Sequence, residues 1–112
     1  MEKITLYQQI IIDLFEEYIG DWAKSAYPLE YQLIADEKRH HYQLVCLGWY
    51  KNRYTHFTVF HFDIINEKVW IQENRTDILV GKDLVAKGIP KTDIVLGLQA
   101  PNVRQYTDYA EK

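Results

Sequence analysis

Four apolar runs lie close together in the middle of the chain, and the short turns between them constrain the fold more than any other feature. The predicted strands cover residues 31–36, 42–49, 54–64 and 69–72. Lys51-Asn52-Arg53 and Asn66-Glu67 are the polar turns between the last three of them. Strands joined by such short turns can pair only antiparallel. The sequence therefore predicts an antiparallel meander, in which Asn66 takes a positive φ because its turn lacks glycine.

A helix with one apolar stripe precedes the strands. Its apolar residues recur at helical spacing, as Tyr7, Ile10, Ile11, Leu14, Phe15 and Tyr18. Thr5 and Gln8 have the pattern of a capping box, although an earlier start is open as well, and Gly20 and Pro28 bound the end of the helix.

A second helix is predicted over residues 77–87, with a final strand over 93–98. Gly88 suits the end of this helix and Pro90 prevents its continuation, whereas Gly81 lies inside it. The predicted fold class is α+β, with an N-terminal helix packed on an antiparallel β-meander, then a second helix and a C-terminal strand. Its 112 residues are expected to form a single domain, 1–112.

Composition excludes several classes of protein. The formal net charge of −3 argues against tight, unaided binding of nucleic acid. Cys46 is the only cysteine, so an intrachain disulfide is impossible. Neither a signal peptide nor an apolar stretch long enough to span a membrane is recognisable. We expect a soluble, cytoplasmic protein that carries no cofactor.

Aromatic residues make up 14% of the chain, more than a core of this size can enclose. On the strand 54–64, alternation predicts Phe57 and Val59 on one face, with Tyr54, Phe60 and Phe62 on the other. A sheet with two apolar faces predicts a homo-oligomer or a partner protein. The predicted interaction surface comprises Trp49, Tyr54, Phe60, Phe62, Trp70, Arg104, Tyr106 and Tyr109.

No pattern in the sequence predicts a nucleophilic enzyme, since neither Ser25 nor Cys46 belongs to a recognisable motif. His61 and Asp63 share a strand face and are candidate metal ligands, which Glu73 and Asp77 could approach. A metal-dependent hydrolase is therefore an alternative, although a histidine hydrogen-bonded at a sheet surface or interface is the preferred explanation of His61, because no third ligand has a fixed spacing. The candidate nucleic-acid contacts are Lys38, Arg39, Lys51 and Arg53.

Several segments together resemble one family. They are His61-Phe62-Asp63-Ile64, Val69-Trp70-Ile71-Gln72, Gly88-Ile89-Pro90-Lys91, Asp93-Ile94-Val95-Leu96-Gly97 and Arg104-Gln105-Tyr106-Thr107-Asp108-Tyr109-Ala110. Over essentially its whole length the sequence resembles the XisI family, the excision-controlling factors best known from cyanobacteria.

This resemblance implies a small α+β protein that acts with a companion, XisH, in controlling excision of a DNA element by a separate recombinase. It implies no catalytic residues. The leading hypothesis is a non-enzymatic partner or regulatory subunit of a XisH-like protein, with DNA contacted only indirectly or weakly. The second hypothesis is a DNA-binding recombination directionality factor.

Overall fold

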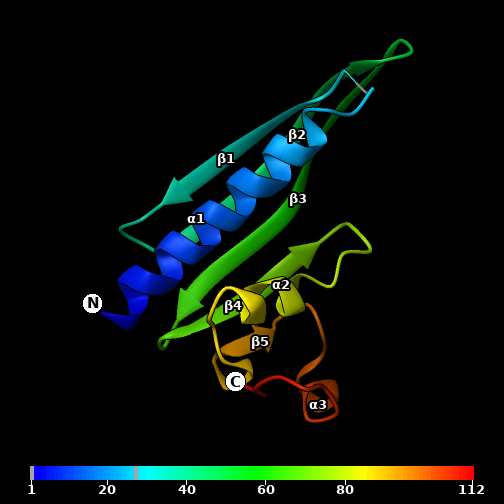
Figure 1. The fold of residues 1–112 in the computed structure, drawn as a ribbon. Coiled ribbons are helices and arrows are strands. Elements are labelled where there is room, and N and C mark those ends of the chain that lie inside the picture. The colour runs from blue at the N-terminus through cyan, green and yellow to red at the C-terminus, as the bar shows by residue number, and fades with distance from the viewer. Residues whose placement is uncertain (1, 27) are drawn as a thin grey trace.

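The protein is a five-stranded sheet with its two longer helices packed on one face (Figure 1). The structure, a computed structural model, describes residues 2–26 and 28–112. Its elements are, in chain order, α1 (Lys3–Trp22), β1 (Glu30–Asp36), β2 (His41–Tyr50), β3 (Arg53–Ile65), β4 (Lys68–Asn74), α2 (Val80–Ala86), the short 3₁₀ helix η1 (Lys91–Asp93), β5 (Ile94–Leu96) and α3 (Pro101–Arg104). No helix in the described ranges is long and apolar enough to cross a membrane.

The strands lie in the order β1-β2-β3-β4-β5, which is also their order along the chain. The first four form an antiparallel meander, whereas β5 pairs parallel to β4. A parallel neighbour requires a crossover, and α2 provides it. The predicted α+β class and the predicted order of elements are confirmed, and the parallel edge strand makes the sheet mixed.

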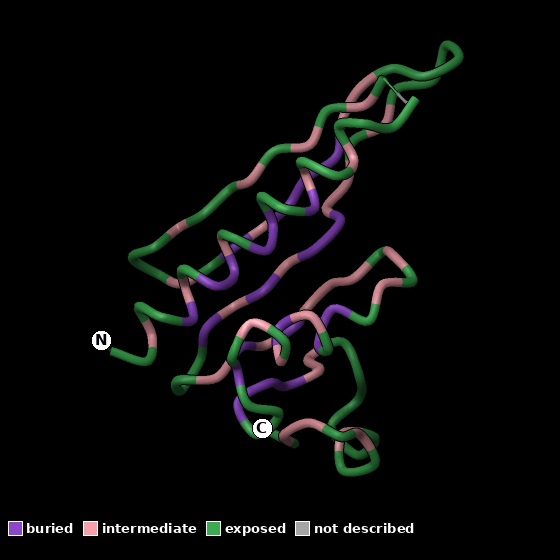
Figure 2. The backbone as a smooth tube through the Cα atoms, viewed as in Figure 1, coloured by how far each residue is buried: buried purple, intermediate pink, exposed green. Residues whose placement is uncertain are grey.

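Helix α1 covers the sheet with the apolar stripe that the sequence predicts. All six stripe residues, from Tyr7 to Tyr18, are buried. Its start differs from the capping-box prediction, because the helix begins at Lys3 and Thr5 already lies inside its first turns. Gly20 also lies inside the helix, which continues to Trp22. Figure 2 shows the buried backbone where α1 faces the sheet.

A β-bulge in β3 determines which side chains face α1. Leu44 pairs with Phe60 and Val45 with Thr58, so Val59 is an extra residue. The bulge interrupts the alternation of faces. As a result Phe57, Val59, Phe60 and Phe62 all pack into the core that includes the α1 stripe.

The predicted division of these rings between two faces is therefore wrong. Beyond the bulge, the face opposite α1 carries His61 and Asp63 in place of phenylalanine side chains. The prediction of a homo-oligomer rested on a second apolar face of this strand, which the structure does not show. The homo-oligomer therefore stays a prediction without that support.

Two tight turns connect β2 to β3 and β3 to β4 with both central residues at positive φ. These residues are Lys51 and Asn52 in the first turn, and Asn66 and Glu67 in the second. Positive φ at both central positions defines the type I′ turn, whose twist matches that of the flanking strands. The predicted positive φ of Asn66 is confirmed, and Glu67 shares it at 60°.

The second helix begins at Val80, three residues later than predicted. The preceding loop is held by side-chain hydrogen bonds that compete with helical ones. The Oδ1 of Asn74 accepts from the backbone N–H of Thr76 at 2.9 Å, and the Thr76 hydroxyl oxygen accepts from the N–H of Ile78 at 3.0 Å. Gly88 follows the helix at a φ of 113°, as a C-terminal glycine should. The last strand is shorter than predicted, because residues 91–93 form η1 and only 94–96 pair.

Candidate functional site

Three side chains with metal-ligating atoms meet on the face of the sheet opposite α1. Asp63 of β3 pairs directly with His41 of β2, and His61 lies two residues before Asp63 on the same face. His41 Nδ1 lies 2.7 Å from Asp63 Oδ1, and His61 Nε2 lies 2.8 Å from the same oxygen. We refer to His41, His61 and Asp63 as the histidine–aspartate cluster.

Two glutamines complete the surroundings of the cluster. Gln72 Nε2 donates to Asp63 Oδ2 at 3.3 Å, and Gln43 Nε2 lies 3.1 Å from His61 Nδ1. Burial alone would raise the pKa of Asp63, but the hydrogen bonds from His41, His61 and Gln72 hold that pKa below its ordinary value. Asp63 is therefore a carboxylate at neutral pH. Only 13% of its side chain is exposed, against 53% for His41.

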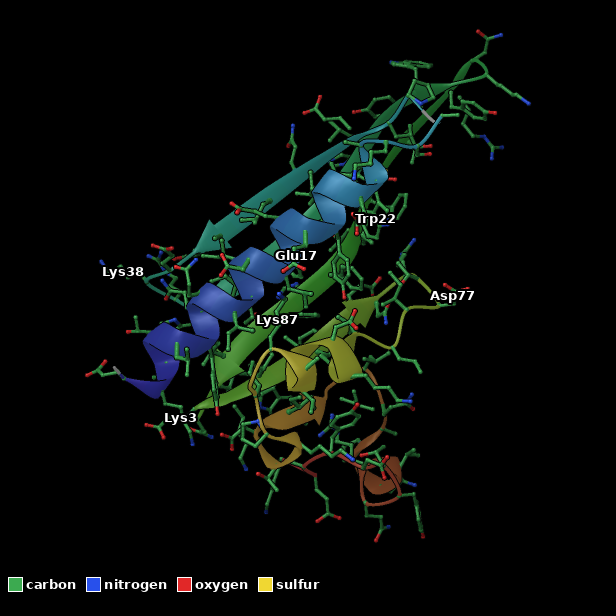
Figure 3. All side chains as sticks on the ribbon, viewed as in Figure 1. Lys3, Glu17, Trp22, Lys38, Asp77 and Lys87 are labelled. Carbon is green, nitrogen blue, oxygen red and sulfur yellow. The ribbon has the colours of Figure 1, made fainter. Side chains whose placement is uncertain are left out.

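The sequence predicted two members of this cluster and missed the third. Glu73 and Asp77 were expected to approach His61 but do not join the cluster. Within residues 2–26 and 28–112, the group of metal-ligating side chains consists of His41, His61 and Asp63 alone. Glu73 pairs with His61 across the strands but its carboxylate binds Arg75 at 2.8 Å. Asp77 lines a separate depression beside Trp22 and Arg75 (Figure 3).

A second candidate surface is the end of the β2–β3 hairpin, which extends beyond the rest of the sheet (Figure 1). Trp49 and Tyr54 pair across the strands, with ring centroids 5.2 Å apart and exposures of 64% and 51%. Tyr50 pairs with Arg53, and Lys51 Nζ lies 5.3 Å from the Tyr50 ring centroid. We call Trp49, Tyr50, Lys51, Arg53 and Tyr54 the hairpin tip.

The other predicted interaction residues lie in different places. Phe60 and Phe62 are fully buried beneath α1, so they are core residues and no part of an exposed surface. Tyr109 packs against the core, with its ring beside Gly81. Tyr106 is 83% exposed and remains available as a surface contact.

Arg104 and Trp70 form a structural contact. The Arg104 guanidinium lies 5.1 Å from the Trp70 ring centroid, a cation–π arrangement. The same guanidinium donates to the carbonyl oxygens of Leu96 and Gly97, both at 3.3 Å, and of Gln99 at 3.0 Å. These bonds hold the segment after β5, so Nε and Nη2 of Arg104 are engaged within the chain.

The predicted nucleic-acid contacts are divided between two ends of the sheet. Lys51 and Arg53 belong to the hairpin tip, whereas Lys38 and Arg39 lie in the β1–β2 turn at the other end of β2 (Figure 3). Arg39 also pairs with Asp36 at 3.2 Å. The four cations therefore form no single basic face.

The chain is similar to known proteins over almost its whole length. The family model described as XisI protein matches residues 1–111. Among solved structures, a XisI-like protein from Anabaena variabilis ATCC 29413 is 44% identical; the match covers 96% of this chain and 97% of that one, with a TM-score of 0.86.

A second structure, the fdxN element excision controlling factor XisI from the same organism, is 30% identical. That match covers 99% of this chain and 100% of the other, with a TM-score of 0.80. None of the curated proteins matches this chain.

Proposed function

The chain belongs to the XisI family, and from that premise we propose that it is a non-catalytic excision-controlling factor. In this proposal it acts as partner or regulatory subunit of a XisH-like protein in the control of DNA element excision. The second relative supports the process, because that protein is named as an excision controlling factor of the fdxN element.

The exposed aromatic rings of the hairpin tip carry this proposal. Tryptophan and tyrosine contribute most of the binding energy at many protein interfaces, and large exposed rings on a projecting element mark a contact surface. Trp49 is 64% exposed although it belongs to a regular strand. Neither Trp49 nor Tyr54 belongs to the core formed by the described residues. Because core packing does not explain these rings, we assign the tip to the partner.

The environment of the only cysteine supports a non-catalytic role. Cys46 is buried in the core that α1 covers. Burial raises the pKa of its thiol, although a hydrogen bond with Tyr31 acts in the opposite direction. Because a nucleophilic cysteine needs an accessible thiolate, Cys46 acts as a small core residue.

Co-expression with a tagged XisH-like protein tests the partner proposal. We expect the native chain to elute with the tagged protein. A W49A/Y54A double variant should bind at least tenfold more weakly, because hot-spot aromatics commonly contribute about 2 kcal/mol or more. The matched control is L79A, which removes an apolar side chain that is 65% exposed outside the tip.

Two results would contradict the proposal or relocate the contact. A folded native chain that repeatedly elutes without the tagged protein would refute the partner role. Loss of binding in Y106A, with W49A/Y54A unaffected, would instead place the contact at the tail.

Direct DNA binding by a recombination directionality factor is the second candidate function. The observation that favours it is the position of Lys51 and Arg53 on a two-stranded ribbon, a shape that fits a DNA groove. The net charge of −3 opposes it.

Titration with salt decides this case. Groove binding by the tip predicts an affinity that falls with salt concentration and falls further in K51A/R53A, but not in the control K38A/R39A. Absence of binding at low ionic strength would eliminate the candidate.

A further inference from the structure

We propose that the histidine–aspartate cluster is a binding site for a divalent transition-metal ion of the zinc type. The ligands are one nitrogen of His41, one nitrogen of His61 and a carboxylate oxygen of Asp63. This site lies on the open face of the sheet and is separate from the hairpin tip, so it is independent of the partner proposal.

The first argument is distance. The ligand atoms of the three residues all lie within 4.8 Å of one another. Zinc binds imidazole nitrogen and carboxylate oxygen at about 2.0–2.2 Å, which puts two ligands of a tetrahedral ion about 3.3 Å apart. The two nitrogen–oxygen distances are 2.7 and 2.8 Å. Each must therefore open by only about half an ångström, which small side-chain rotations accomplish.

The second argument is the rigidity of the frame. His41, His61 and Asp63 come from β2 and β3, which pair in the middle of the meander from His41–Asp63 to Tyr50–Arg53, with an interruption at the Val59 bulge. Sites built on strands hold their ligands more precisely than sites built on loops. His41 and Asp63 are paired residues on opposite strands, so the register of the sheet itself brings two of the three ligands together.

The third argument is the outer layer of hydrogen bonds. Metal-binding histidines usually have their second ring nitrogen bonded to a neighbouring group. Gln43 is in that position at His61 Nδ1, and its amide can present oxygen or nitrogen by a simple flip. With the amide oxygen toward the ring, Nδ1–H donates to Gln43 and Nε2 is free to bind the ion. Gln72 similarly holds the second oxygen of Asp63.

The donor set favours a particular class of ion. Two imidazoles and one carboxylate suit Zn²⁺ and its neighbours, whereas Mg²⁺ and Ca²⁺ prefer oxygen ligands throughout. The Asp63 carboxylate supplies a negative charge that offsets part of the ionic charge. His41 is the exposed member, so the side of the site next to it is open to water or to a group from another molecule.

Calorimetry on protein without a histidine tag, stripped of metal by a chelator, tests the site. We expect Zn²⁺ to bind with one-to-one stoichiometry, and Co²⁺ to develop the visible absorption of a four-coordinate complex. H41A and D63N should each weaken Zn²⁺ binding by at least tenfold, on the scale that even outer-layer mutations produce. H56A is the matched control, because His56 is an exposed histidine of β3 outside the cluster.

The variants also separate ligand loss from misfolding. His41 is exposed, so H41A should keep the native circular dichroism spectrum and unfolding midpoint while losing zinc affinity. The proposal is overturned if the native protein shows neither Zn²⁺ heat nor a Co²⁺ spectrum. It is equally overturned if H41A, D63N and H56A bind zinc as tightly as the native chain, since the ion would then lie elsewhere.

Discussion

Asp93 connects the N-terminal part of α1 to the segment before β5 through two contacts. The Tyr7 hydroxyl donates to Asp93 Oδ2, and Lys3 Nζ lies 3.0 Å from the same oxygen. Burial alone would raise the pKa of Asp93, but these two partners hold it below its ordinary value. The Asp93 carboxylate therefore stabilises the fold most when it is ionised.

This lowered pKa predicts a stability that depends on acid. A carboxyl with a depressed native pKa contributes fully above its unfolded pKa of about 3.9, and the contribution is lost as pH falls through the native value. We expect D93N to lower the free energy of unfolding at pH 7 by about 2 kcal/mol and to reduce the further loss below about pH 4. Urea unfolding at a series of pH values measures both.

The control for this experiment is D77N, which removes an exposed carboxylate and should leave the profile unchanged. Part of the acid dependence will remain in D93N, because Asp63 also has a lowered pKa. A D93N profile identical to that of the native chain would show that the Asp93 contacts contribute nothing.

Gly81 is kept small by a ring and not by the backbone. A Cβ at Gly81 would lie 2.6 Å from the Tyr109 hydroxyl oxygen and 2.8 Å from its Cζ, closer than atoms can approach. We expect G81A to destabilise the native chain by about 1 kcal/mol or more through overpacking. In a Y109A background the same change should stabilise by up to about 1 kcal/mol, because alanine is the better helix former. Thermal unfolding of the native chain, G81A, Y109A and G81A/Y109A gives the coupling free energy between the two positions. Equal effects of G81A in both backgrounds would contradict the predicted clash.

At the scale of the element, prediction succeeded where the signal was local. The stripe from Tyr7 to Tyr18 requires nothing beyond a helix and a core, and all of its residues are buried. The faces of β3 could not be predicted, because the extra residue Val59 exists only relative to the register of β2. The start of α2 was misplaced since Asn74 and Thr76 use their side chains to hold a loop that periodicity does not reveal.

The histidine–aspartate cluster likewise contains residues that local spacing predicts and one that it does not. His61 and Asp63 are two residues apart, so strand geometry alone places them on one face. His41 lies 22 positions before Asp63, and only the pairing of β2 with β3 brings them together. Counting residues back along both strands from the turn at Lys51-Asn52 places His41 opposite Phe62. The pairing with Asp63 follows only when the extra residue Val59 is taken into account.

The turn between β3 and β4 gives a prediction about Glu67. Its φ of 60° is a left-handed conformation that side chains with a Cβ adopt at a cost of roughly 1–2 kcal/mol. Asn-Gly is the preferred pair in a type I′ turn, so E67G should raise the free energy of unfolding by about 1 kcal/mol. Urea unfolding measures this free energy.

The control E16G places glycine at an exposed helical position of α1 and should lower the free energy of unfolding by about 1 kcal/mol. Loss of stability in E67G would contradict the prediction.

At the scale of the whole molecule, α1 connects the meander to the C-terminal segments by side chains as well as by packing. Tyr18 donates to Asp83 of α2, and Glu17 pairs with Lys87 at the end of that helix (Figure 3). Together with the Tyr7–Asp93 contact, these bonds join both ends of α1 to residues far along the chain. The meander and the C-terminal segments, α2 to β5, should therefore unfold together in one transition.

The homo-oligomer remains a prediction, but the surface expected to form its interface changes. The hairpin tip, and not the polar face of β3, now offers the exposed rings that another copy could cover. In the absence of a partner protein we expect the native chain to form a dimer or larger species, and W49A/Y54A to be monomeric, because exposed tryptophan and tyrosine favour association. Light scattering over a range of concentrations measures the mass. A native chain that stays monomeric at high concentration would contradict the prediction.

The contact between Tyr7 and Asp93 spans 86 positions of the chain. A ribosome adding about 5–20 residues per second needs roughly 4–17 s to cover that interval. During this time the meander of β1 to β4 can assemble from neighbouring segments, but Tyr7 and Lys3 still lack Asp93 as a partner. These two contacts at the start of the helix can therefore form only after Asp93 has been added, and we expect nascent chains stalled before Asp93 to lack them.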